Sequence, residues 1–222
     1  MSIQLTEQDK ERIQAAVVNA EGRTSGEIVA CLMPQSDSYG MAYVRAAILF
    51  AAVAALVGFA VHRFYDGWGL AWLYTAAGIT ATVLFAALLG AFLAYVSPAL
   101  RRAMIGTDRL RRMVKLQAYR TFVEEEVFVT DRRTGILIFV SAFEHRVEVL
   151  ADEGINSVVA QDAWSSIVAR MITLLREGKV ADGFEQAIRQ CGAILREHGL
   201  EVRRDDDNEL SNELRIRDRP AD

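Results

Sequence analysis

The densest polar group in the sequence lies directly before the apolar run Gly135–Ser141, which predicts a strand. Asp131, Arg132 and Arg133 occupy this position, and ligands of open α/β sheets bind where loops meet strand ends. Two adjacent arginines can hold a phosphate or a carboxylate, with Asp131 orienting one of them. The three residues are therefore candidate catalytic residues. The alternative is a solvated turn whose arginines face phospholipid or pair with residues 124–126.

A second polar group has the chemistry of a metal site. Asp152 and Glu153 follow the next predicted strand, Arg146–Ala151, and Glu27 begins an earlier one. Carboxylates suit a hard cation such as Ca²⁺ or Mg²⁺, and Glu27 adds a third ligand if the strands are neighbours. The alternative is that these carboxylates pair with Arg146 and cap the following helix.

Cationic residues form a third group, and no acidic residue but Asp108 lies among them. These residues are Arg101, Arg102, Arg109, Arg111, Arg112 and Lys115. Each cation near an anionic membrane surface contributes about 1 kcal/mol of attraction, so membrane lipids are an expected partner. The formal net charge of the chain is -4, and the basic stretch has little aromatic interleaving, so nucleic acid is not expected as a partner.

Standard catalytic motifs are absent from the sequence. It contains no GxGxxG, P-loop, HExxH, GxSxG or EF-hand pattern, and its three histidines share no ligand spacing. Cys31 and Cys191 are the only cysteines, which fits a reducing compartment. No cofactor is required by these patterns, and Ca or Mg is the only one that they suggest.

Two apolar runs supply the excess of the 52% apolar residues over the usual share of roughly 45–50%. A membrane-spanning helix needs roughly 20 apolar residues, and the runs predict spans at about 43–61 and 70–96. Arg45 can reach the interface, where Trp68, Trp72, Tyr74 and Tyr95 also belong. We therefore predict a transmembrane hairpin over 41–97. The alternative is a pair of buried helices in a soluble core.

The hairpin predicts an orientation in the membrane. Only His62–Gly69 separates the spans, so both flanks lie on one side, and the flanks carry most of the arginines. Cytoplasmic segments are richer in Lys and Arg, and the N-terminal stretch lacks the pattern of a cleavable signal. We expect a multi-pass protein of the inner (cytoplasmic) membrane with cytoplasmic N- and C-termini.

The remaining segments predict one domain of the α/β class, a small sheet flanked by helices and interrupted by the hairpin. Residues 1–40 supply a helix and the strand Glu27–Met33, which are too short for a core of their own. Residues 98–200 supply the rest: a helix near 108–126, the two later strands, and helices near 162–177 and 182–198. Residues 201–222 are charged and predict a disordered or loosely helical tail.

The strand segments resemble a known family. Thr134–Ser141 (TGILIFVS) followed by Glu144–Ile155 (EHRVEVLADEGI) resembles the central hairpin of TPM domains, and Thr24–Val29 resembles their first strand. Trp164 and Asp182–Phe184 are similar to the closing helices. The resemblance implies an α/β sandwich found in thylakoid photosystem-repair proteins, bacterial envelope proteins and an animal receptor-associated protein. It also implies that members include acid phosphatases, calcium binders and accessory or assembly factors.

Three functions remain open at this point. The first is a non-enzymatic accessory, assembly or interaction module for another membrane protein or for a second copy of the chain. The second is a metal-dependent phosphatase-like hydrolase, and the third is a surface sensor that binds anionic lipid. The missing catalytic motifs favour the first.

Overall fold

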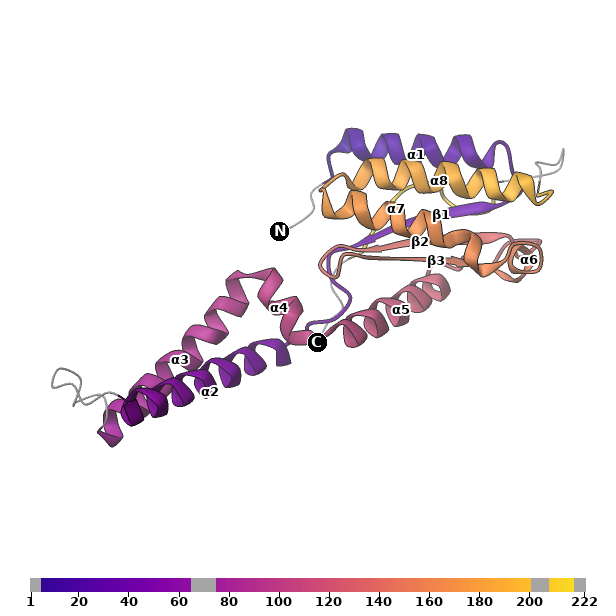
Figure 1. Cartoon of the computed structure of the whole chain (residues 1–222). Helices are drawn as coiled ribbons and strands as arrows, with labels where there is room; N and C mark the ends of the chain where they lie inside the picture. The colour runs from indigo at the N-terminus through magenta and orange to yellow at the C-terminus, as the bar shows by residue number, and fades with distance from the viewer. Residues whose placement is uncertain (1–4, 65–74, 201–207, 218–222) are drawn as a thin grey trace. The chain divides into compact units, whose positions relative to one another are not determined.

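The structure is a computed structural model that describes residues 5–64, 75–200 and 208–217 (Figure 1). The chain forms two compact units, one from residues 1–38 with 111–222 and the other from residues 39–110. The first unit contains a sheet, and the second contains the apolar helices. Each unit is described separately below.

The sheet has four strands in the order β3-β2-β1-β4. Their bounds are β1 Glu27–Met33, β2 Gly135–Ser141, β3 Arg146–Ala151 and β4 Arg215–Ile216. β1 pairs in parallel with β2 and with β4, whereas β2 and β3 form an antiparallel hairpin. The bounds of β1, β2 and β3 confirm the three predicted strands.

Helices cover both faces of the sheet, as Figure 1 shows. One face is covered by α1 Glu7–Glu21, α7 Ser165–Arg176 and α8 Val180–Glu197, and the short helices α6 Glu153–Asn156 and η2 Gln161–Trp164 connect β3 to α7. The other face is covered by α5 Thr107–Glu124. Because side chains alternate along a strand, β1 and β2 contribute to both layers and are buried along their whole length.

α1 begins after Thr6, which caps the helix. The Thr6 hydroxyl accepts a hydrogen bond from the Asp9 amide at 3.1 Å, and the Asp9 carboxylate accepts one from the Thr6 amide at 3.0 Å. This reciprocal pair satisfies two amides that the helix leaves without partners. Ile13 and Val17 then fall on the buried side of α1 and pack in the core.

The second unit consists of α2 Met41–Phe64, α3 Ala76–Val96 and α4 Pro98–Ile105. α2 and α3 are long and apolar enough to cross a membrane, and only 6% and 11% of their most apolar windows are buried. Core helices of a soluble protein are mostly buried, so that alternative does not fit α2 and α3. Residues 65–74 lie outside the described residues, and with them lie Trp68, Trp72, Tyr74 and the predicted start of the second span.

The C-terminal segment differs from the predicted disordered tail. Residues 208–217 are ordered on the first unit, where Leu210 and Leu214 pack against the two sides of the core and β4 adds a strand to the sheet. The charge pattern explains the difference, because the two arginines that flank Ile216 pair with acidic residues at the end of α5. Residues 201–207 and 218–222 of the predicted tail lie outside the described residues.

Candidate functional site

The predicted arginine turn lies at the amino end of β2. The Thr134 hydroxyl donates to the Ser25 carbonyl at 2.8 Å, and the Thr134 amide donates to the Thr130 hydroxyl at 2.9 Å. A Cβ at Gly135 would lie 1.9 Å from the Val127 carbonyl oxygen, so only glycine allows the backbone to pass there. These contacts fix the backbone from which Asp131, Arg132 and Arg133 project.

The structure brings the arginine turn and the predicted metal ligands together. The Arg133 Nε lies 2.8 Å from Asp152 Oδ2, and Arg133 Nη2 donates to Asp152 Oδ1 at 3.1 Å. The Gly154 amide donates to the Arg133 carbonyl at 2.9 Å, and a Cβ at Gly154 would meet the Arg132 carbonyl oxygen at 2.3 Å. The two motifs are therefore two halves of one interlocked corner at the edge of the sheet.

The ion pair in this corner differs from the pairs in both alternatives given above, whereas the helix cap expected in the second alternative is present. Arg133 pairs with Asp152 rather than with residues 124–126, and Asp152 pairs with Arg133 rather than with Arg146. Asp152 also caps α6 by accepting a hydrogen bond from the Glu153 amide at 2.8 Å. The Asp152 side chain is only 6% exposed, whereas Arg133 is 49% exposed and also lies over the ring of Phe128. The exposed edge of the Arg133 guanidinium is the part of this pair that an external anion can reach.

Glu27 does not join Asp152 and Glu153. β2 lies between β1 and β3, so the strands that carry these carboxylates are not neighbours, and two strand spacings amount to about 10 Å. The Glu27 carboxylate accepts hydrogen bonds from the Glu209 and Leu210 amides, both at 3.4 Å. Among the described residues, no group of three or more His, Cys, Asp or Glu side chains could hold a metal ion. The predicted three-carboxylate arrangement is therefore wrong, because its condition that the strands be neighbours fails.

Asp131 lies on the exposed side of the corner. Its amide donates to the Glu209 carboxylate at 2.9 Å, so the C-terminal segment touches this turn as well as Glu27. Its side chain, like that of Arg132, is exposed. The corner thus presents Asp131, Arg132 and one edge of Arg133 to solvent, a combination that can bind an anion weakly and orient it.

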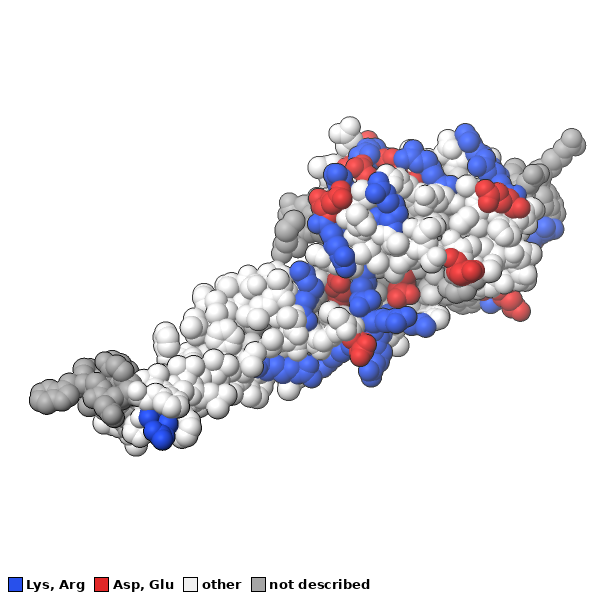
Figure 2. All heavy atoms as spheres, in the orientation of Figure 1, with Lys and Arg blue, Asp and Glu red and all other residues white. Residues whose placement is uncertain are grey.

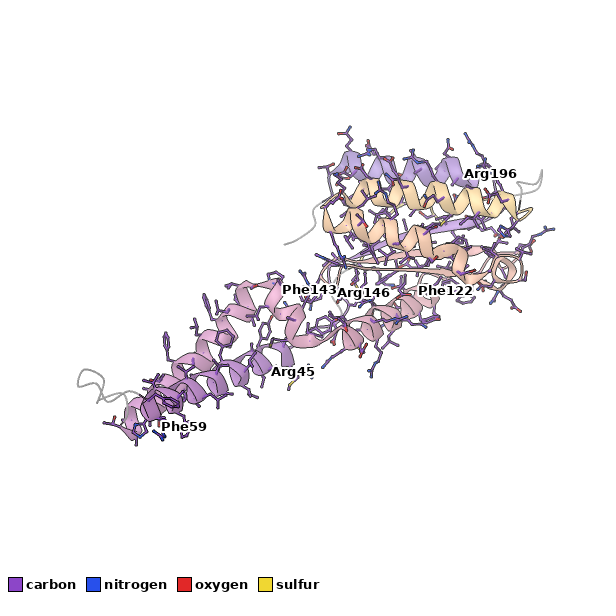
Figure 3. All side chains as sticks on the ribbon, viewed as in Figure 1. Arg45, Phe59, Phe122, Phe143, Arg146 and Arg196 are labelled. Atoms are coloured by element: carbon purple, nitrogen blue, oxygen red, sulfur yellow. The ribbon has the colours of Figure 1, made fainter. Side chains whose placement is uncertain are left out.

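A buried polar cluster that the sequence did not predict lies at the opposite, carboxyl edge of the sheet. Glu144 accepts a hydrogen bond from the Ser36 amide at 2.9 Å and another from the Ser141 hydroxyl, and the two serine hydroxyls lie 2.7 Å apart. All three residues are buried. They join the segment after β1 to the turn between β2 and β3, where Figure 3 labels Phe143 and Arg146.

The arginine turn lies at the amino end of β2, and this cluster lies at the carboxyl end of the same strand. Ligands of parallel sheets bind at the carboxyl ends of strands, and Ser141 ends the central strand, whereas Arg133 precedes it. Ser141, the polar residue that ends the otherwise apolar β2, is the feature of the sequence that could have indicated this cluster. In this fold the cluster is buried and hydrogen-bonded internally, so it holds two chain segments together and does not offer groups to a ligand.

The cationic residues divide between the two units. Within the second unit, Arg101 lies over the ring of Tyr43 and Arg109 lies over the ring of Tyr39. Arg45 donates to the Met104 and Ile105 carbonyls at 2.9 and 3.2 Å, so it also caps the end of α4.

Of the remaining four predicted cations, Arg102 lies half-buried on α4, and Arg111, Arg112 and Lys115 are exposed on α5. In the view of Figure 2, blue side chains gather over α5, while α2 and α3 are almost free of charge.

Both cysteines are unreactive structural residues. Each is buried and free, and burial raises the pKa of Cys31 and of Cys191 to about 12. Nucleophilic attack requires the thiolate, so burial disfavours either residue as a nucleophile at neutral pH.

The described clefts do not coincide with the predicted residues. One of about 170 Å³ lies between α1 and α8 and is lined partly by Arg23, Arg189 and Arg196. A more open one of about 400 Å³ lies along α1 alone. The smaller cleft is below the usual size of a pocket for an organic ligand, roughly 300–1,000 Å³. Neither cleft identifies an active site.

Comparison with known proteins bears on the fold of the chain. Residues 106–194, from the start of α5 through most of α8, match the family model described as the TPM domain. No curated protein matches the chain. Among solved structures, the NMR structure of the BA42 protein from the psychrophilic bacterium Bizionia argentinensis sp. nov. is similar, with a TM-score of 0.57 and 18% sequence identity over 96% of this chain and 94% of that chain. This likeness is one of fold, and residues 106–194, which include Arg133, Asp152 and Glu144, are similar to the TPM domain.

Proposed function

We propose that the protein is an integral membrane protein whose TPM domain serves as a non-enzymatic accessory or assembly module. Its partner is another membrane protein or a second copy of the chain. The observation that carries the proposal is the insertion of α2 and α3 between β1 and α5, with their apolar side chains exposed. A domain interrupted in this way is held at the bilayer by both of its halves, a suitable position for contacting proteins in that bilayer.

The interior of the domain supports the same proposal. Arg133 and Asp152 neutralise each other at one edge of the sheet, and Glu144 is satisfied by two donors at the other. A catalytic site needs polar groups that converge on a substrate, whereas these groups converge on one another.

Crosslinking in native membranes, followed by purification and mass spectrometry, tests the proposal. We expect a reproducible heteromeric or homomeric species that survives mild detergent. Recovery of monomer alone, under conditions in which other membrane complexes survive, would exclude the accessory function.

We keep phosphate-ester hydrolysis as the second proposal, because the structure joins the two motifs on which it depends. Asp131, Arg132 and Arg133 would bind the ester phosphate, and Asp152 with Glu153 would contribute to a Ca²⁺ or Mg²⁺ site. Purified protein should then release phosphate from a generic ester in the presence of either metal. Arg133→Ala and Asp131→Asn should each abolish the release while the protein stays folded. If both variants release phosphate as fast as the unaltered protein, this proposal is wrong.

A further inference from the structure

α5 has two faces, and only one of them packs in the fold. Val114 and Ala118 are fully buried against the sheet. Leu116, Tyr119 and Val123 are 61%, 50% and 60% exposed on the same helix. Their spacing of three and four residues aligns them along one side, opposite the buried side. The helix therefore carries an exposed apolar stripe, defined here as Leu116, Tyr119 and Val123.

Cations surround this stripe. At about 100° per residue, Arg112 continues the line of the stripe one turn earlier, while Lys115 and Arg120 fall on either side of it. Lys115 Nζ lies 5.8 Å from the centre of the Tyr119 ring, and Arg120 pairs with Glu124 at 2.6 Å. Arg112 forms no ion pair with any residue that the structure describes. An apolar stripe with cations along both flanks is the pattern of a helix that lies in a membrane interface.

We propose that this face of α5 lies on anionic phospholipid, with the stripe at the boundary of headgroups and acyl chains and the cations at the phosphates. The inference rests on the proposed insertion of α2 and α3 and adds to it a second membrane contact, made by the TPM domain. A docked lipid surface also explains why three large apolar side chains stay exposed on a helix whose opposite side is fully packed.

The chain connection favours lipid over a soluble partner. α3 ends at Val96 and α5 begins at Thr107, with α4 between them. An eight-residue helix is about 12 Å long, so the start of α5 stays close to the point where α3 would leave the bilayer. The charge of the face is complementary to anionic headgroups, and the attraction would weaken as salt screens it.

The test uses the full chain in lipid nanodiscs with a single fluorescent label. Cys31 and Cys191 are both fully buried, so an environment-sensitive dye directed at thiols should react with an introduced cysteine at Leu116→Cys or Val123→Cys. Val18→Cys is the matched control, because Val18 is 53% exposed on α1, which covers the other face of the sheet. Discs contain phosphatidylcholine alone or phosphatidylcholine with phosphatidylglycerol.

We expect a blue shift and a several-fold gain in emission at positions 116 and 123 in the anionic discs, with quenching by brominated lipid. The label at position 18 should not change between discs. Arg112→Gln with Lys115→Gln, in the Leu116→Cys background, should reduce the gain, and so should high salt. Equal emission in both kinds of disc would overturn the proposal, as would a gain that depends on protein concentration and not on lipid, which would indicate self-association.

A separate measurement distinguishes this proposal from the proposed function. If α2 and α3 do not insert, the unlabelled protein will not stay with discs through gel filtration and an alkaline wash. A protein that stays with the discs while positions 116 and 123 remain solvent-exposed would overturn only the α5 proposal.

Discussion

At the scale of single residues, the carboxyl edge of the sheet depends on Glu144. Its carboxylate accepts from the Ser36 amide and the Ser141 hydroxyl, and all three groups are buried. Glu144→Ala would leave the buried Ser36 amide without its acceptor, whereas the Ser141 hydroxyl could still donate to the Ser36 hydroxyl, and an unsatisfied buried polar group costs about 1–3 kcal/mol. We expect Glu144→Ala to lower the free energy of unfolding by about that amount, measured by thermal or chemical unfolding in detergent.

Two variants control this prediction. Glu144→Gln keeps one acceptor oxygen and should have a smaller effect. Glu11→Ala removes an exposed carboxylate from α1 and should leave stability almost unchanged. Equal effects of Glu144→Ala and Glu11→Ala would contradict the role of the buried cluster.

Glu21 makes stability depend on pH. Burial raises the pKa of its carboxyl from 4.5 to about 8, although the Ile28 amide donates to it and favours the charged form. Between these two values the unfolded chain releases the proton and the folded chain keeps it. Stability should therefore be highest below pH 4.5 as far as this group is concerned, fall as pH rises, and level off above about 8.

The decline is expected to be at most about 1.4 kcal/mol per pH unit. The glutamine side chain of Glu21→Gln cannot ionise. The unfolding midpoint of this variant should therefore change less with pH across the same window than that of the unaltered protein. An unchanged slope would show that another group causes the pH dependence.

The residue types in the sequence predicted where the polar residues of the arginine corner lie, but not which of them pair with each other. The polar residues before β2 and after β3 are visible in the sequence because each set interrupts an apolar run. Which of them meet depends on strand order, and β2 between β1 and β3 separates Glu27 from Asp152. The residue types along the chain do not reveal the order of the strands in the sheet, so the partner of Arg133 could not be predicted.

At the scale of elements, α2 and α3 depend on a close approach at Gly90. A Cβ at this position would lie 2.6 Å from the Ala46 carbonyl oxygen and 2.8 Å from Phe50 Cβ. Backbone cannot move away as a flexible side chain can, so a larger residue must separate the helices. Gly90→Val should destabilise the hairpin by about 1–3 kcal/mol.

Gly58→Val is the matched control, because nothing lies within 4 Å of a Cβ built there. The measurement is the fraction of protein that stays folded and monodisperse in detergent after heating. A loss at Gly58→Val as large as at Gly90→Val would indicate a general intolerance of α2 and α3 to substitution.

Ion pairs to the end of α5 accompany the short pairing of β4. Arg215 lies 3.3 Å from Glu125, Arg217 pairs with Glu124 and Glu125, and the Arg217 amide donates to the Leu32 carbonyl at 3.0 Å. Arg215→Gln with Arg217→Gln should release this segment. Hydrogen exchange at the position 217 amide should then accelerate at least tenfold, while β2 amides exchange as before; unchanged exchange at 217 would contradict the role of the ion pairs.

The longer elements were predictable and β4 was not. Runs such as Glu27–Met33 and Gly135–Ser141 bury both faces, and this gives them a nearly continuous apolar sequence. Arg215–Ile216 contains one apolar residue, and its pairing depends on acidic side chains at the end of α5. A short segment stabilised by distant charges has no periodicity to detect.

At the scale of the whole molecule, the proposed topology places both flanks of the hairpin on the cytoplasmic side. Arg63, in the last turn of α2, should then lie on the outer side. In right-side-out vesicles, a membrane-impermeant thiol reagent should label Arg63→Cys directly and Val18→Cys only after permeabilisation. The native cysteines give little background because both are buried and their pKa values are about 12. The reverse labelling pattern would invert the topology.

The position of the hairpin also sets an order of events during synthesis. β1 pairs with β2 from Glu27↔Gly135 onward, so the first strand is made roughly a hundred residues before its central partner. At about 5–20 residues per second, the ribosome takes at least several seconds to produce that partner. During this delay both proposed spans emerge, while β1 has no strand to pair with. Delivery to the bilayer would thus come before completion of the sheet, and a nascent chain that misses the membrane would expose an unpaired strand, apolar from Ile28 to Met33, to chaperones and proteases.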